Sequence, residues 1–327
     1  MLSVLLSTLV LSAAASWGLL RTLIPQLRRC LLDQPNIRSS HQVATPRGGG
    51  LAFVVVAVGV SLWAIASNSW SPAAALPLIG LPLAVVGILD DRHGLSTGVR
   101  FGVQLATGLG LIVCSPLPVP WLALPLLLIA TTAVINFTNF MDGLDGLVAG
   151  CMTLALAAAC LQLSAPLTLW ALVGALLGFL VWNWSPAKVF MGDVGSTFLG
   201  AVFAGVILQA RSWSEALSLL LLATPLLADA CLCVPRRLLA GQPVFKAHRL
   251  HLFQRLHQAG WCHAQVSTLY ITATAALAIT RLCSGWREVM AVAALEVLVG
   301  IWLDQRIAVP FAASLAGIQA HQSGAIR

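Results

Sequence analysis

The sequence is poor in charge and has no recognisable soluble portion. Only 9% of its 327 residues are charged, whereas 59% are hydrophobic and the mean hydropathy is +0.91. An ordinary soluble domain carries roughly 25% charged residues, so the composition excludes one and makes the lipid bilayer the main solvent. Because no low-complexity linker separates the hydrophobic runs, we expect a single membrane domain over residues 1–327.

Two other features are missing. None of the eight cysteines has the spacing of a metal-binding motif. Cys231 and Cys233 form C-x-C inside an apolar run, and we expect them to pack in a helix rather than bind a metal or form a disulfide. The chain also lacks the internal repeat that many secondary transporters show, which makes a polytopic transporter the weaker alternative to an enzyme.

Long apolar runs dominate the chain. A spanning helix needs about 20 apolar residues, or about 17 at the short end. The pattern predicts an all-α, polytopic integral membrane protein with about 11 transmembrane helices. The candidate runs are 1–20, 49–67, 73–89, 99–114, 121–135, 146–163, 167–182, 196–210, 216–234, 265–283 and 289–303. We interpret the first run as a retained helix, with a cleaved signal peptide as the alternative.

Basic residues lie mostly on one side of these runs. Cytoplasmic loops are enriched in Lys and Arg, and fifteen of the eighteen basic residues are cytoplasmic if the loop after the first helix is. Only Arg211, Arg281 and Arg287 fall opposite. This places the N-terminus outside and the C-terminus in the cytoplasm. All seven His and all eight Asp lie on or near the basic side, which suits membrane lipids and anionic substrates better than nucleic acid.

Five polar segments join the runs on the basic side. The first, 33–50, is rich in proline and glycine, which predicts an irregular loop. Its Arg38, His41 and Arg47 are suited to binding phosphate, although they are equally compatible with ordinary membrane anchors.

The second segment, LDDRHGLS, places Asp90 and Asp91 together at a helix end. Two adjacent carboxylates at a membrane boundary repel each other and lose hydration. A divalent cation would relieve both costs. The alternative is a solvated turn in which Arg92 is their partner.

The third segment, NFTNFMDGLDGL, follows an apolar run directly. If it is helical, Asp142 and Asp145 share one face, and Asn139 lies three residues before Asp142. Gly143 and Gly146 would let a ligand approach closely. These amides and carboxylates suit Mg²⁺ and a nucleotide better than core packing.

The fourth segment, NWSPAKVFMGDVGS, places Asp193 between Gly192 and Gly195, with Phe190 three residues earlier. A single carboxylate there is compatible with a helix cap. Beside the other carboxylates it is better interpreted as a metal ligand.

The fifth segment, 235–264, is the longest. If it is helical from Lys246, then His248, His251 and Arg255 share one face that is suited to a pyrophosphate or to proton transfer. The alternative is an interfacial helix with Leu252, Phe253 and Leu256 against lipid.

Together these segments resemble the polyprenyl-phosphate N-acetylhexosamine-1-phosphate transferase superfamily, which includes the WecA and MraY transferases. The most specific signals are LDDRHGLS, NFTNFMDGLDGL and FMGDVGS, in that order. The resemblance implies transfer of a sugar 1-phosphate from a UDP-N-acetylamino sugar to undecaprenyl phosphate at the cytoplasmic face of a bacterial inner membrane, with release of UMP. Mg²⁺, or alternatively Mn²⁺, would be the cofactor, and a homodimer is compatible with the sequence.

The resemblance also implies roles for individual residues. Asp90, Asp91, His248 and His251 would be catalytic, with the two aspartates deprotonating or orienting the lipid phosphate. Asp193 and Asp142 would bind the metal, and Phe190 would stack on uracil. The remaining positions around the substrates are Thr45, Asn139, Asp142, Asp145, Asn183 and Arg249.

The same motifs indicate which branch of the superfamily the chain resembles and argue against other enzyme classes. The peptidoglycan branch carries three consecutive histidines, whereas this chain reads His248-Arg249-Leu250-His251. We therefore expect an initiator of O-antigen or a related envelope glycan, most like the WbpL type, with the phospho-muramoyl-pentapeptide transferases as the alternative. Asp229 lies in a near match to a P-L-x-D motif with one extra residue, so we give it little weight. The spaced signature of CDP-alcohol phosphotransferases is absent.

Overall fold

The computed structural model describes residues 2–35, 40, 41, 43–242 and 248–315, and this part of the chain is mainly helical. The strands β1 (Leu32–Asp33) and β2 (Thr45–Pro46) form a short antiparallel pair. The helices are α1 (Leu2–Cys30), α2 (Leu51–Ala66), α3 (Leu76–His93), α4 (Thr97–Val113), α5 (Leu124–Phe140), α6 (Leu147–Gln162), α7 (Leu167–Asn183), α8 (Asp193–Leu208), α9 (Trp213–Leu220), α10 (Thr224–Leu239), α11 (Leu252–Gln258), α12 (His263–Cys283) and α13 (Trp286–Arg306). The predicted all-α membrane fold is confirmed.

Each predicted run coincides with helical structure. The segments long and apolar enough to cross a membrane number five among the described residues: Leu2–Cys30, Ala73–His93, Trp121–Phe140, Trp213–Leu239 and His263–Cys283. The other helices are shorter or more polar, so a total of eleven spans stays a prediction. Within the run 216–234 the helix is continuous but changes geometry, because a 3₁₀ helix at Leu221–Ala223 joins α9 to α10. Pro225, which has no N–H to donate, lies in the first turn of α10.

Helix α8 lies at the centre of the bundle, and its residues from Val194 to Leu208 are all buried. Helix α7 packs along α1 through small residues. A Cβ atom added at Gly178 would stand 2.1 Å from the carbonyl oxygen of Ala13, and one at Gly174 would stand 2.4 Å from that of Leu9. Small residues allow helix backbones to approach closely in membranes, where van der Waals packing replaces the hydrophobic effect.

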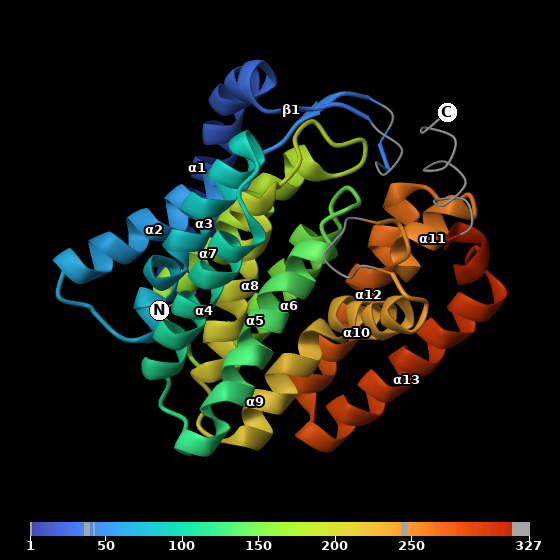
Figure 1. Ribbon diagram of the computed structural model, residues 1–327. Helices are drawn as coiled ribbons and strands as arrows, with labels where there is room; N and C mark the ends of the chain where they lie inside the picture. Colours follow the sequence, from blue (N-terminus) through green and yellow to red (C-terminus); the bar gives the residue numbers. More distant parts are fainter. Residues whose placement is uncertain (1, 36–39, 42, 243–247, 316–327) are drawn as a thin grey trace.

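The polar segments meet at one end of the bundle. In Figure 1 the loops around β1 and α11 lie in the upper part, and α9 lies at the bottom. Backbone hydrogen bonds connect the first segment to the fourth: Phe190 N–H donates to the Pro46 carbonyl at 2.8 Å, and Gly49 N–H donates to the Phe190 carbonyl at 2.9 Å. The prediction that these segments share one face is confirmed, and the irregular first loop is thereby ordered beside the start of α8.

Candidate active site

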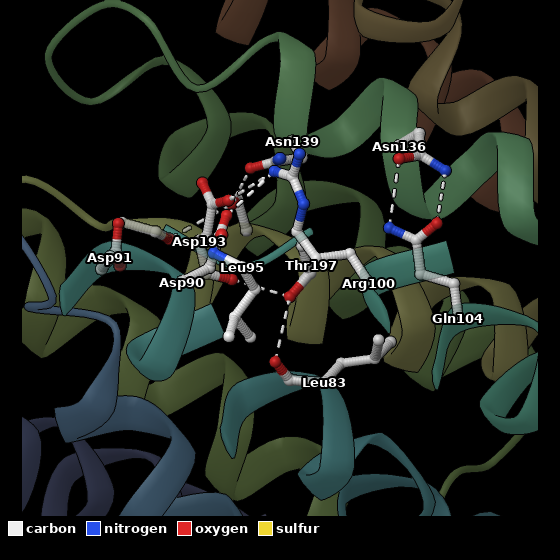
Figure 2. Close-up of polar contacts among 12 residues, drawn as sticks. Leu83, Asp90, Asp91, Leu95, Arg100, Gln104, Asn136, Asn139, Asp193 and Thr197 are labelled. Atoms are coloured by element: carbon white, nitrogen blue, oxygen red, sulfur yellow. Dashed lines mark hydrogen bonds and ion pairs between the residues drawn. The ribbon is translucent and has the colours of Figure 1, made fainter. Parts of the chain in front are cut away.

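Three predicted carboxylates gather at the start of α8. Figure 2 shows Asp90 and Asp91, from the end of α3, beside Asp193, the first residue of α8. The N-cap position of α8 is Gly192, so the interpretation of Asp193 as a capping residue is wrong. The approach of α3 is close, since a Cβ atom at Gly87 would stand 2.5 Å from the backbone of Asp193.

Arg100, near the start of α4, joins two of these carboxylates. Its Nη1 atom lies 2.9 Å from Asp90 Oδ2 and 4.0 Å from Asp193 Oδ2. Asp90 also accepts a hydrogen bond from the Leu95 N–H at 2.5 Å. The sequence interpretation missed Arg100. The sequence feature that could have identified it is a positive charge in the first turn of a helix. The helix dipole disfavours such a charge unless a specific negative partner compensates.

Asp91 has a different partner. Its Oδ1 atom lies 3.5 Å from Arg47 Nη1, and Arg47 Nη2 lies 3.5 Å from Asp33 Oδ1. The alternative in which Arg92 pairs with these aspartates is wrong, because Arg92 is exposed whereas Arg100 pairs with Asp90 and Arg47 with Asp91. The tertiary fold brings the first segment, rather than the neighbouring residue, against Asp91.

Asp142 is a fourth carboxylate of this group. The expected helix through residues 136–147 is wrong beyond Phe140, because residues 141–146 form a loop in which Gly146 has φ of +73°. Burial, together with the charges of Asp193 and Asp91, raises the pKa of Asp142 to about 8. Such a shift means that the ionised form lacks sufficient compensating positive charge.

Asp145 points to another part of the fold. Its Oδ1 atom lies 3.1 Å from His263 Nδ1, and its Oδ2 atom accepts a hydrogen bond from Ala187 N–H at 3.1 Å. Burial alone would raise the pKa of Asp145, but the bond and charge of His263 lower it. The two aspartates of the third segment therefore do not share a helix face, and Asp145 ties the loop to α12.

Two predicted amide side chains, Asn139 and Asn183, connect the third segment to the fourth. Asn139 Oδ1 accepts a hydrogen bond from Ser196 Oγ at 2.5 Å, which joins α5 to α8 near Asp193. Asn183 is buried; its amide accepts from Gly146 N–H at 3.0 Å and donates to the Val189 carbonyl at 2.9 Å. Asn183 thus holds two loops together, and its contact with substrate stays a prediction.

Phe190 and Thr45 lie beside this group. The Phe190 ring is half-buried and meets the His41 ring edge to face, with centroids 4.8 Å apart. Thr45 is buried in β2, and its hydroxyl donates to the Val43 carbonyl at 3.0 Å. Stacking of Phe190 on uracil and binding of substrate by Thr45 stay predictions.

Residues 248–251 of the histidine segment are not helical, so the helix considered from the sequence does not carry His248 and His251. Lys246 lies outside the described residues, and α11 begins only at Leu252, with His251 in extended conformation at its N-cap. His248 and His251 are nevertheless brought together, with ring centroids 4.9 Å apart. The alternative of a lipid-facing helix is wrong, because Phe253 and Leu256 are fully buried.

Asp229 lies at the centre of this second polar group, although its sequence context offered little reason to expect a role for it. Its carboxylate accepts hydrogen bonds from Leu252 N–H at 2.8 Å and from the hydroxyl of Tyr270 at 2.9 Å, and it lies 3.3 Å from His251 Nδ1. Arg249 is also in this segment, and burial lowers the pKa of its guanidinium.

The first group suits a divalent cation. The Oδ2 atom of Asp91 is buried and has no hydrogen-bond partner in the described part of the chain. Beside it, Asp142 has a pKa raised by burial and by neighbouring negative charge. Carboxylate oxygens are the ligands that Mg²⁺ and Mn²⁺ prefer, so a cation here would supply the charge that these oxygens lack.

The part of the chain that contains these carboxylates also resembles known proteins. The family described as Glycosyl transferase family 4 matches residues 73–211, a stretch that includes α3 to α8 and all four carboxylates. Among the relatives is a probable undecaprenyl-phosphate N-acetylglucosaminyl 1-phosphate transferase of Bacillus subtilis, 33% identical over 267 residues, with 73% of each chain covered.

Two further relatives represent two branches. An undecaprenyl-phosphate alpha-N-acetylglucosaminyl 1-phosphate transferase of Yersinia pestis is 30% identical, covering 76% of this chain and 75% of the relative. A phospho-N-acetylmuramoyl-pentapeptide-transferase of Synechococcus is 32% identical, covering 78% of this chain and 85% of the relative. The chain is thus a polytopic membrane transferase that belongs to glycosyl transferase family 4.

Proposed function

We propose that this protein transfers an N-acetylhexosamine 1-phosphate from a UDP-sugar to undecaprenyl phosphate and releases UMP. The observation that carries the proposal is the convergence of Asp90, Asp91, Asp142 and Asp193 at one end of a membrane bundle, with Arg47 and Arg100 among them. Opposite charges packed at the end of apolar helices suit a reaction between a lipid phosphate and a nucleotide diphosphate. The names of the relatives support the same reaction.

Phosphoryl transfer depends mainly on positioning and on neutralising charge. Asp193 and Asp142 would hold Mg²⁺, which when bound would neutralise part of the diphosphate charge. Arg100 and Arg47 are half-exposed, with 37% and 40% of their side chains accessible, so their guanidinium groups are positioned to contact phosphate oxygens as well as the aspartates. Phe190, half-buried beside this group, would stack on the uracil.

The acceptor needs little deprotonation. The second pKa of a phosphate monoester is about 6, so the lipid phosphate is mostly a dianion near neutral pH. Asp90 and Asp91 are each held by an arginine, which suits orienting the acceptor more than abstracting a proton. We therefore favour direct attack of the lipid phosphate oxygen on the sugar-linked phosphorus.

The pathway assignment rests on the histidine segment. Three consecutive histidines mark the peptidoglycan branch, and this chain instead has Arg249 and Leu250 between His248 and His251. This supports initiation of O-antigen or a related envelope glycan at the cytoplasmic face of the bacterial inner membrane. Transfer of phospho-muramoyl-pentapeptide is the second candidate, because a relative of that name is as similar as the others.

Purified protein incubated with undecaprenyl phosphate, Mg²⁺ and a panel of radiolabelled UDP-N-acetylhexosamines tests the proposal. We expect equimolar UMP and labelled lipid from at least one sugar. A parallel reaction with UDP-N-acetylmuramoyl-pentapeptide distinguishes the branches. Turnover with this substrate alone would assign the protein to peptidoglycan synthesis. If neither substrate yields a labelled lipid, the proposed reaction is wrong.

The pH profiles of Asp90→Asn and Asp91→Asn separate the two roles of these residues. If one aspartate is a general base, its replacement should alter the acid limb of the rate profile. We expect lower rates with that limb unchanged, because orientation of an already ionised phosphate requires no proton transfer. The comparison is made at saturating Mg²⁺ and UDP-sugar.

A further inference from the structure

A second group of ligand-type side chains lies outside the carboxylate site, where α10 meets the segment before α11. Cys233, His248 and His251 each present one ligand atom, and these three atoms all lie within 4.8 Å of one another. Cys233 is a buried residue of α10, with 4% of its surface exposed. The fold assembles this group, because fourteen residues lie between Cys233 and His248 and no short motif marks it.

The orientation of His251 is controlled by Asp229. The Nδ1 atom of His251 lies 3.3 Å from the Asp229 carboxylate, which is itself held by Tyr270 and by two backbone N–H groups of α11. The proton on Nδ1 therefore points to Asp229. The other nitrogen, Nε2, is buried and has no hydrogen-bond partner among the described residues. Carboxylate–histidine pairs of this kind orient metal-binding imidazoles in proteins.

His248 completes the group. Its ring stacks on that of His251 at 4.9 Å, and its Nδ1 accepts a hydrogen bond from Leu250 N–H at 3.2 Å. An ion on Nε2 of His248 would require the ring proton to move to Nδ1 and the Leu250 bond to open. This is a local adjustment of a segment outside any helix.

We propose that Cys233, His248 and His251 bind a zinc ion. One thiolate and two imidazoles are a ligand set that zinc accepts, with a fourth position left for water or another ligand. A cavity of about 560 Å³ lined by α10, α12 and α13 reaches Cys233 and Asp229. The ion would tie the histidine segment to α10. The site is separate from the carboxylates that would hold Mg²⁺.

Ligand protons must leave when the ion binds. The thiol of Cys233 must ionise, and each imidazole must present an unprotonated nitrogen to the ion. Zinc binding therefore releases protons and should weaken as pH falls.

The test uses full-length protein without a histidine tag, purified in detergent without chelator. We expect one equivalent of zinc by elemental analysis, and a thiolate-to-metal charge-transfer band when Co²⁺ replaces it. Cys233→Ser should abolish both signals. Cys231→Ser is the matched control, because this exposed cysteine lies two residues away on the same helix and should leave both signals intact.

Thermal unfolding guards against a variant that merely misfolds. Added Zn²⁺ should raise the Tm of the wild type and of Cys231→Ser, but not that of Cys233→Ser. If Cys233→Ser does not fold, His248→Gln replaces it, with the same loss of zinc expected. Zinc content and Tm response unchanged in the folded Cys233 or His248 variant would overturn the proposal, as would a wild type that binds no zinc.

Discussion

The Oδ2 atom of Asp91 lies directly against Gly192, at the turn that starts α8. A Cβ atom at residue 192 would stand 2.6 Å from this oxygen, and Gly192 has φ of +73°, which favours glycine. The backbone of the fourth polar segment therefore determines where the carboxylate of the second one lies. Asp91 and Gly192, from two distant parts of the sequence, come this close because Gly192 has no side chain.

Gly192→Ala should therefore impair catalysis. The added methyl group meets Asp91 and strains the backbone, by about 1 kcal/mol or more for the positive φ alone. We expect the turnover rate to fall at least tenfold, measured as UMP release. Gly98→Ala is the control, because Gly98 has open space around its Cβ position and no positive φ. Equal activity of the two variants would contradict the predicted role of this contact.

Arg100 should matter far more than its neighbour Arg92. Arg100→Gln leaves Asp90 and Asp193 without their shared cation, and loss of one such positioned charge typically costs about 100-fold in rate. Arg92→Gln is matched in residue type and lies nearby, in the last turn of α3, but Arg92 is exposed. Steady-state kinetics should show wild-type behaviour for Arg92→Gln. Similar losses in both variants would indicate a general effect of surface charge instead.

Removal of divalent metal should abolish UMP release, and Mg²⁺ or Mn²⁺ should restore it. Metal stabilisation of phosphoryl transfer is worth several kcal/mol, and each ~1.4 kcal/mol is tenfold, so Asp193→Asn should lower kcat on the order of a thousandfold. Asp142→Asn should also weaken the dependence on Mg²⁺. Full turnover in EDTA-treated protein would show that no metal takes part.

Asp145 should contribute to stability in a pH-dependent way. Its folded pKa lies below its ordinary value of about 3.9. The stabilisation is therefore fully present above that value and is lost as pH falls through the folded pKa. Asp145→Asn should cost about 1–3 kcal/mol near neutral pH, seen as a lower Tm in detergent, and the difference should shrink as the pH falls below about 3.9. A Tm difference independent of pH would mean that the charge is unimportant.

The predicted orientation can be tested with single cysteines placed on exposed residues. In a background whose exposed Cys30, Cys231, Cys262 and Cys283 are serine, Asn68→Cys should react with an impermeant maleimide from outside the cell. Ala259→Cys should react only after the membrane is opened. Both positions are exposed in the structure. The reverse pattern would place the carboxylate group on the outer face.

Much of the fold was predictable because hydropathy is a local property. Each apolar run became helical in the structure, and the motifs around Asp90, Asp142 and Asp193 lie at one end of the bundle as expected. Turns were less predictable. The pattern D-G-L-D-G was compatible with a helix, yet Gly146 adopts positive φ and the loop separates Asp142 from Asp145. Such conformations depend on what packs against the loop.

The sequence by itself determined that this chain resides in a membrane, which apolar runs are helical and which of their ends carry carboxylates, since these follow from residue type and spacing alone. Only the tertiary structure decided which side chains pair with these carboxylates. Arg47 reaches Asp91, Arg100 joins Asp90 to Asp193, and Tyr270 and His251 meet at Asp229. Each of these contacts joins different helices or loops, so it depends on how the helices pack, which no single stretch of sequence contains.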